Sequence, residues 1–282
     1  MSEPARHPDP HIAVQRDVLV RYLDVWTAAA LRSQRGATYV SAAGGHFAGD
    51  AFRVFGEFVD RLAGHHLDVV IVGASADVGE PPAGLSVRVV ADTEDVPVSG
   101  PTLAHLDGGS EAAWRLVASL GHGKGREVVV TSRTVGTDYR ERLRAAGFSR
   151  TLAVELVADD DQAQLLAFAT DTDRHLETFK NELWAVDEFA GIRYRDPHDA
   201  ERTLVDISLT PQLLPLRRML LAELARRGRC TVADLQRHTL LETIYRPADT
   251  VGAVTSAVAA GDIAREPEKG RLTPRTLVSA VP

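Results

Sequence analysis

The sequence contains a single cysteine, Cys230, and this scarcity excludes an intramolecular disulfide and any metal site built from cysteines alone. It also lacks any apolar run approaching the roughly 20 residues that a helix needs to cross a bilayer. The first ten residues are polar and rich in proline, so we expect residues 1–10 to form a flexible tail and not a secretory signal. Together these absences predict a cytoplasmic protein.

The net charge of −7 is unevenly distributed along the 282 residues. From Pro211 onward there are 11 Arg and Lys against 7 Asp and Glu, which gives +4, and the rest of the chain therefore carries −11. An acidic body with a basic C-terminal part favours contact of that part with nucleic acid or with an acidic protein. Because the excess is small, an ordinary protein surface would give the same pattern.

The segment from residue 126 to residue 170 predicts the fold class. Arg126–Thr131 is a β-branched run typical of a strand buried on both faces, and Tyr139–Ala146 has helical charge spacing and ends at Gly147. Two strand-like runs follow, Thr151–Val157 and Gln164–Thr170, separated by an acidic turn that suits a hairpin. This order resembles the closing half of a Rossmann-like methyltransferase sheet, in which the hairpin inserts an antiparallel last strand into a parallel sheet.

The preceding part of the chain alternates helices and strands, which favours a parallel α/β sheet with helices on both faces. We predict helices at 11–33, 51–62 and 111–120 and strands at 37–41, 67–72, 86–91 and 102–106. A further helix, Asp173–Phe189, is expected to bury Leu176, Phe179 and Leu183 and to leave Lys180 facing outward. We assign residues 11–200 to this Rossmann-like domain.

The C-terminal residues, 205–282, predict a different unit. Pro211–Arg227 reads as a strong helix, Thr231 caps a short helix ending at Leu241, and Pro247–Ala260 forms a third helix. A strand beginning near Gly261, a Pro/Lys/Gly turn and a second strand at Arg271–Thr273 complete the order of a winged helix-turn-helix domain.

Several segments together resemble one family, the three-Cys-motif partner proteins. They are Tyr22–Trp26, Ala37–Val40 with the glycines that follow, Leu106–Gly109, Phe168–Thr170 and Phe179–Asp187. The resemblance implies a class I methyltransferase fold with a helical C-terminal extension. It also implies a partner: a protein with a three-cysteine motif, similar to radical S-adenosylmethionine enzymes, with which this chain would act in nucleic-acid repair or modification.

The candidate cofactor site lies at the carboxyl edge of the predicted sheet, where ligands of open α/β folds bind. In such folds the first strand-to-helix turn carries an acid and a glycine-rich loop that approaches S-adenosylmethionine. Here the turn contains Gly44 and Gly45, but Ser41 stands at the acid position. Asp107, in a turn where the resembled family has Asp-Pro-Phe-Gly, is the remaining acid; it either contacts a ligand or caps the helix starting near Ser110. We therefore expect no bound cofactor, with S-adenosylmethionine as the alternative.

Two further features of the sequence have simpler explanations than a functional site. His105 and Asp107 share a face of one strand but lack a third metal ligand, so we predict no metal site. Cys230 has no His or Asp pattern that marks a nucleophile, and we expect it to be inert.

The predicted winged helix lacks the side chains that read bases. Its third helix, Ala248–Ser256 at the centre, contains no basic residue, so sequence-specific readout and a role as a transcriptional regulator are disfavoured. The alternative to DNA contact is that the unit packs on the sheet domain or docks a protein. Backbone contact would use the residues that flank the helix or lie in the wing: Arg237, His238, Arg246, Arg265, Lys269 and Arg271.

These observations lead to one leading hypothesis and one alternative. The leading hypothesis is an accessory protein whose degenerate methyltransferase-like domain serves as a scaffold and whose winged helix contacts DNA or a partner in DNA repair. The alternative is an active S-adenosylmethionine-dependent methyltransferase with an unusual pocket formed by Ser41, Gly44, Gly45 and Asp107.

Overall fold

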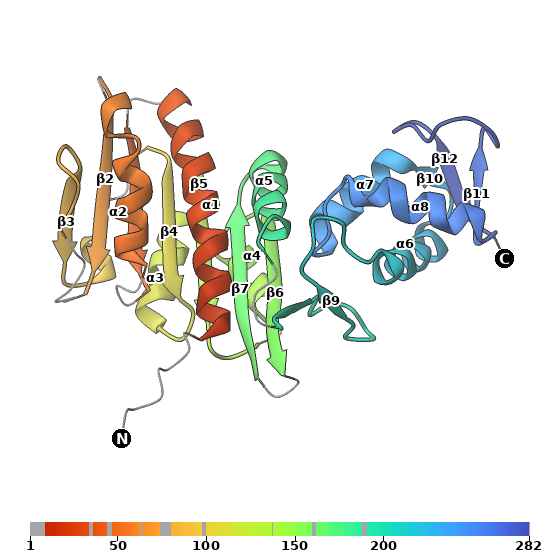
Figure 1. The fold of residues 1–282 in the computed structure, drawn as a ribbon, viewed down its shortest axis with the longest axis horizontal. Coiled ribbons are helices and arrows are strands. Elements are labelled where there is room, and N and C mark those ends of the chain that lie inside the picture. The colour runs from red at the N-terminus through yellow and green to blue at the C-terminus, as the bar shows by residue number, and fades with distance from the viewer. Residues whose placement is uncertain are drawn as a thin grey trace.

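The chain forms a large mixed α/β sheet and a smaller C-terminal unit, side by side (Figure 1). The computed structural model describes residues 9–33, 36–43, 47–62, 64–73, 80–97, 100–136, 138–159, 162–187 and 191–281. The large sheet has nine strands in the order β3-β2-β1-β4-β5-β7-β6-β8-β9. Its strands are β1 (Gly36–Ala42), β2 (His66–Val72), β3 (Ser86–Val90), β4 (Thr102–Asp107), β5 (Arg126–Ser132), β6 (Arg150–Asp159), β7 (Gln162–Thr170), β8 (Arg193–Arg195) and β9 (Leu204–Asp206).

The strand order confirms the Rossmann-like sheet of the methyltransferase type. Strands β1 to β5 are parallel, and β7 inserts antiparallel between β5 and β6. The hairpin predicted from the acidic turn is therefore the β6–β7 pair. Two short antiparallel strands, β8 and β9, extend the sheet to Asp206, beyond residue 200, where we predicted that the first domain ends.

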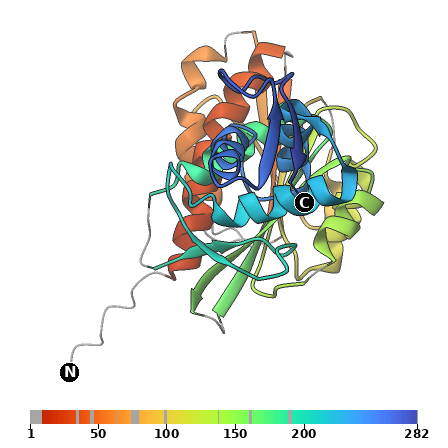
Figure 2. The ribbon, with the colours of Figure 1, turned by 90° about the vertical axis from the view of Figure 1, so that its right-hand side faces the viewer.

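Helices cover both faces of the sheet because its central strands are apolar on both sides. Residues of α1 (Pro10–Ser33), α2 (Ala48–Gly56) and α5 (Asp173–Trp184) pack in one core cluster, and those of α3 (Glu111–Leu120) and α4 (Tyr139–Ala145) pack in another. Figure 2 shows the red and orange helices on one side of the sheet and the yellow-green helices on the other. Short 3-10 turns, Val59–Arg61 and Thr93–Asp95, complete the unit. None of the described helices is long and apolar enough to cross a membrane.

The C-terminal unit contains three helices and a small antiparallel sheet of order β10-β12-β11. Its elements are α6 (Leu214–Arg227), β10 (Cys230–Thr231), α7 (Val232–Glu242), α8 (Asp249–Ala259), β11 (Ile263–Glu266) and β12 (Leu277–Ala280). The strand predicted at Arg271–Thr273 is wrong. Thr273 instead begins a turn, in which its carbonyl accepts a hydrogen bond from the Thr276 amide at 3.0 Å, and β12 starts after that turn.

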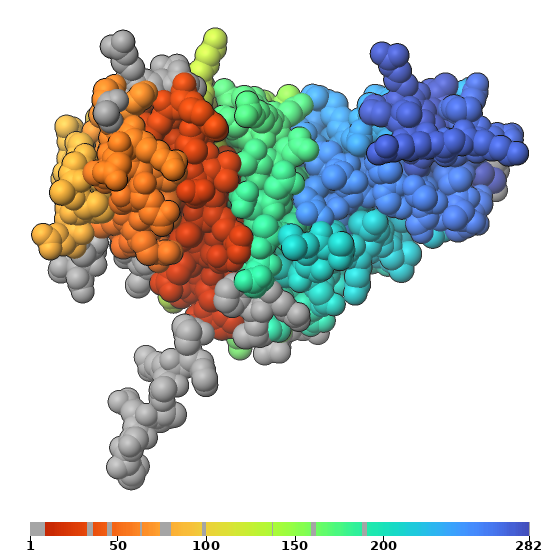
Figure 3. Space-filling model, turned by 45° about the horizontal axis from the view of Figure 1, so that its top comes forward, coloured from red at the N-terminus to blue at the C-terminus, as the bar shows by residue number. Residues whose placement is uncertain are grey.

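The two units share one continuous apolar core, which passes through Trp184 at the end of α5. Its indole ring stacks on Tyr245 with ring centroids 5.6 Å apart and donates a hydrogen bond to the Ile244 carbonyl at 3.0 Å. Tyr194 of β8 packs against the same indole, edge to face. In the space-filling view, the green surface of α5 meets the pale blue surface of α7 directly (Figure 3). The C-terminal unit is therefore packed against the sheet and is not tethered by a linker.

The side chain of Lys180 does not face outward, although the sequence predicted that it would. The helix pattern placed its side chain outward, but Lys180 is 0% exposed. Its ammonium group donates to the carbonyl oxygens of Thr239, Leu240, Thr243 and Tyr245 at 2.6–2.9 Å. The polar face of α5 is thus covered by the end of α7, whose last carbonyls have no partner within their own helix.

Candidate functional site

A cavity of about 390 Å³ opens at the carboxyl edge of the sheet, the place predicted for a ligand. Loops after β1, β4 and β5 form most of it, and α1 and β7 close one side. Its lining consists of Ile12, Gln15, Ala43, Phe47, Asp107, Gly109, Thr131, Ser132, Arg133, Thr134 and Gln164. Of these described residues, Asp107 is the single acid. The cavity therefore offers mainly hydroxyl and amide groups to a ligand.

Asp107 stands at the end of β4 with its side chain exposed to this cavity. One carboxylate oxygen, Oδ1, accepts a hydrogen bond from the Gly109 amide at 3.0 Å, which orders the turn. Ser110 occupies the N-cap position of α3 and accepts a hydrogen bond from the Ala113 amide, so helix capping is not the role of Asp107. Gly108 is required in this turn because a Cβ atom there would lie 2.9 Å from the Val130 side chain. Oδ2 of Asp107 has no hydrogen-bond partner within the part of the chain that the structure describes, so it is available to a ligand.

Ser41 is not among the described residues that line this cavity. It is 1% exposed and pairs in register with His105 of β4. Nε2 of His105 is 3.2 Å from the Thr131 hydroxyl, and its Nδ1 has no hydrogen-bond partner among the described residues. Burial lowers the pKa of His105 to about 3, so this imidazole is neutral. Gly44 and Gly45, the other predicted cofactor residues, lie outside the described residues.

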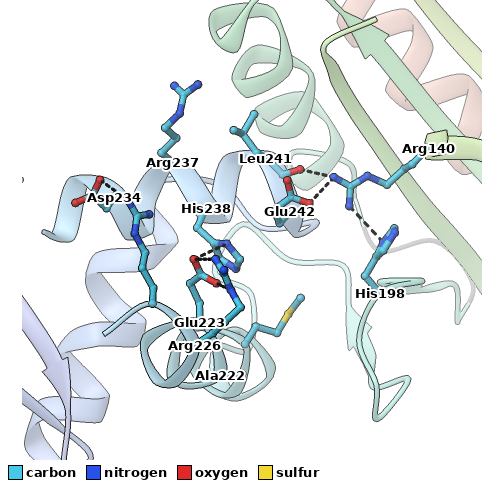
Figure 4. A pocket seen from close by; sticks show the side chains of 12 residues that line it. Arg140, His198, Ala222, Glu223, Arg226, Asp234, Arg237, His238, Leu241 and Glu242 are labelled. Atoms are coloured by element: carbon cyan, nitrogen blue, oxygen red, sulfur yellow. Dashed lines mark hydrogen bonds and ion pairs between the residues drawn. The ribbon is translucent and has the colours of Figure 1, made fainter. Parts of the chain in front are cut away.

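Five of the six predicted nucleic-acid residues separate into two groups, and the sixth, Arg246, lies just before α8 and belongs to neither. Arg237 and His238 belong to α7 and line a groove of about 700 Å³ between α6, α7 and Arg140 of the sheet unit (Figure 4). Arg265, Lys269 and Arg271 belong to β11 and the turn after it, at the far end of the molecule (Figure 1). The structure therefore does not join them into one basic surface.

Ion pairs neutralise most of the charge in the α6–α7 groove. Glu223 binds Arg226 through two hydrogen bonds of 2.8 and 2.9 Å, and Glu242 binds Arg140 at 3.0 Å. Arg237 points away from these pairs in Figure 4 and bonds to Asp173 of α5 at 2.6 Å. His238 lies 3.8 Å from Glu223, and burial lowers the pKa of its imidazole.

The second group is freer, but Arg265 within it and Arg246 outside it have structural partners. Arg246 bonds to Asp249 at the start of α8, and Arg265 donates to the carbonyls of Pro267 and Gly270, which shapes the turn. Lys269 and Arg271 are exposed, and so is Arg275, which the sequence interpretation missed although it lies in the same basic segment. None of these three side chains forms an ion pair with a described carboxylate, unlike the exposed Arg226 and Arg229 of the same unit.

Comparison with known proteins gives only distant structural similarity. No model of a known protein family matches the sequence, and no curated protein matches it. Among solved structures, EvdMO1 has 8% identity and a TM-score of 0.36, and the match covers 63% of this chain and 51% of that one, about half its length. MnmC2 from Aquifex aeolicus has 10% identity and a TM-score of 0.36, with coverage of 62% and 67%.

The tRNA methyltransferase TrmK of B. subtilis has 8% identity and a TM-score of 0.32, with coverage of 83% and 93%. All three scores are below 0.5, so the type of the sheet is identified by its strand order and not by these matches.

Proposed function

We propose that this chain is an accessory protein, in which a methyltransferase-type sheet serves as a rigid support for a C-terminal winged helix. The order helix, strand, two helices and a two-stranded wing in the C-terminal unit supports the winged-helix assignment. The observation that carries the accessory role is the carboxyl-edge cavity, in which Asp107 is the single described acid. With few carboxylates among its described residues, this edge offers few groups to hold the ribose and the amino group of a nucleotide cofactor.

The surface of the C-terminal unit supports contact with a phosphate backbone and not with base edges. Thr255, Ser256 and Ala259 are exposed on α8, and none of them is a side chain that makes bidentate contacts to bases. Lys269, Arg271 and Arg275 stand exposed beside the wing. Positive side chains without acidic partners contact phosphates and release counterions, which makes such binding sensitive to salt.

The DNA part of the proposal is tested by fluorescence anisotropy with a random duplex at 50 and 200 mM salt. We expect the affinity to fall as salt rises, and the double variant Lys269→Glu, Arg271→Glu to bind more weakly with a smaller salt dependence. Arg237→Glu is the control, because Arg237 is paired with Asp173. If the affinity for DNA does not depend on salt, or is unchanged in the double variant, the target of the C-terminal unit is a protein partner and not DNA.

The partner expected from the family resemblance is a three-cysteine protein similar to radical S-adenosylmethionine enzymes. The experiment is co-purification of this chain with such a protein encoded next to it. A stable complex supports the accessory role, and its absence under anaerobic conditions removes this partner from the proposal.

An active S-adenosylmethionine-dependent methyltransferase is the second candidate, and the free Oδ2 of Asp107 in a cavity of about 390 Å³ favours it. Isothermal titration with S-adenosylmethionine decides between the two. Under the accessory proposal we expect no binding in the micromolar range. Micromolar binding that Asp107→Ala abolishes would overturn that proposal and favour the enzyme.

A further inference from the structure

A second cavity, of about 460 Å³, lies at the opposite edge of the sheet, where the parallel strands begin. We call it the amino-edge cavity. The C-terminal half of α1 forms one wall, the first turn of α5 forms the other, and Pro101 and Gly125 stand just before β4 and β5. Its lining consists of Tyr22, Val25, Trp26, Ala29, Ala30, Arg32, Pro101, Gly125, Glu127, Arg174, His175 and Thr178.

The floor of this cavity contains a buried carboxylate in an unexpected place. Glu127 is 1% exposed and lies on β5 next to Val128, Val129 and Val130. Burying a carboxylate among apolar side chains is unfavourable unless donors compensate for lost water. A strand that only had to pack would contain an apolar residue here.

Side chains from two different helices contact this carboxylate, one through a hydrogen bond and the other as an ion-pair partner whose Nδ1 lacks the alignment of a hydrogen bond. The Tyr22 hydroxyl, from α1, donates to Oε2, and Nδ1 of His175, from α5, lies 2.7 Å from Oε1. The contact with Glu127 raises the pKa of His175 despite the opposing effect of burial. Because Nδ1 faces Glu127, the other ring nitrogen, Nε2, is the atom that His175 can offer to a ligand. About a third of the His175 side chain is exposed (34%).

The charge around this cavity is positive. When His175 is protonated, its charge balances Glu127, and Asp171, whose Oδ2 accepts a hydrogen bond from the Gly125 amide at 3.3 Å, is a further acid that acts on this imidazole. Arg32 and Arg174 are exposed at the cavity, and no described carboxylate forms an ion pair with either of them. With His175 protonated, the two arginines against Asp171 leave an excess of one positive charge for a ligand.

The other wall is apolar. Val25, Trp26 and Ala29 present the side of α1 to the cavity, and Pro101 adds a further apolar surface. We infer that the amino-edge cavity binds an organic anion, with an apolar body against α1 and a carboxylate, phosphate or sulfonate beside Arg174 and His175. The site is separate from the carboxyl-edge cavity and does not depend on the accessory role.

The inference is tested by fluorescence titration with two matched probes. 1-Anilinonaphthalene-8-sulfonate has an aromatic body and a negative group, and N-phenyl-1-naphthylamine has the same body without the charge. We expect saturable binding of the sulfonate at one site, with about tenfold weaker affinity in Arg174→Ala and in His175→Gln, because each loses one charge-assisted contact. The affinity of the neutral probe should stay unchanged in both variants.

Arg115→Ala is the matched control, because Arg115 is an exposed arginine of α3 on the other face of the sheet. It should bind the sulfonate as the unaltered protein does. Arg174 is exposed, so its replacement leaves the fold intact and the result interpretable. Binding that does not saturate, equal affinity for the two probes, or an unchanged affinity in Arg174→Ala would overturn the inference.

Discussion

Four backbone carbonyl oxygens from α7 and the loop after it surround the ammonium group of Lys180. Burial lowers the pKa of this lysine to about 7, so the protein bears a desolvation cost to keep the group there. Replacing Lys180 with methionine would remove the donor that these four buried carbonyls share, and of them Thr239 would still accept a hydrogen bond from the Thr243 hydroxyl. We expect Lys180→Met to lower the free energy of unfolding by about 3 kcal/mol, measured by urea unfolding.

Lys124→Met is the control for this prediction, because Lys124 is exposed in a turn. The control should stay within about 0.5 kcal/mol of the unaltered protein. Equal stability of the two variants would show that the four carbonyls do not depend on the ammonium group.

The pair formed by His175 and Glu127 makes stability depend on pH. Because the contact with Glu127 raises the pKa of His175 above its usual 6.5, the folded protein holds that proton more tightly than the unfolded chain. The stabilisation is therefore fully present below pH 6.5 and is lost as pH rises through the raised pKa. We expect about 1 kcal/mol, kept small by the partial exposure of His175. Urea unfolding at several pH values measures it, and His175→Gln should remove this part of the pH dependence.

At the scale of single elements, the start of α7 is fixed by a capping box. The Thr231 hydroxyl accepts a hydrogen bond from the Asp234 amide at 3.1 Å, and the Asp234 carboxylate accepts one from the Thr231 amide at 2.9 Å. We expect Thr231→Ala to reduce the free energy of unfolding by about 1 kcal/mol, measured by thermal unfolding. Thr255→Ala, in the exposed middle of α8, should be neutral or slightly stabilising because alanine favours the helix.

Elements determined by local sequence were predicted well, and those determined by tertiary packing were not. The helix predicted at Glu111–Leu120 is the observed α3, and the hairpin of β6 and β7 follows from an acidic turn between apolar runs. Strands β8 and β9 have three residues each, too few to show an alternating pattern. They exist because the edge of β6 offers a partner to β8, and β8 in turn offers one to β9. Lys180 was misplaced for a similar reason, since α7, which covers it, is distant in sequence.

The candidate sites likewise divide into one that the local sequence predicts and one that only tertiary packing creates. The position of Asp107 at the sheet edge could be predicted, because the end of an apolar run followed by glycines marks the end of a strand. The Tyr22, Glu127 and His175 group could not, because its members come from three elements. A carboxylate within the valine-rich run of β5 was the one signal in the sequence that could have found it.

At the scale of the whole molecule, the continuous core predicts cooperative unfolding. Trp184 connects the core of the sheet with that of the C-terminal unit through Tyr194 and Tyr245. We expect far-ultraviolet circular dichroism and tryptophan fluorescence to report one coincident transition in urea. Trp184→Ala should lower the free energy of unfolding by about 3–5 kcal/mol. In that variant the transitions seen by circular dichroism and by fluorescence should no longer coincide. Two transitions in the unaltered protein would contradict a shared core.

The reactivity of the single cysteine can report how often the C-terminal unit opens. Cys230 is 6% exposed and belongs to β10, which pairs with β12, and burial raises the pKa of its sulfhydryl. An alkylating reagent can reach the sulfur only while that strand pair is parted, so the labelling rate counts openings of the C-terminal unit. Because the chain has one cysteine, each molecule is labelled once, and the labelling kinetics report this strand pair alone.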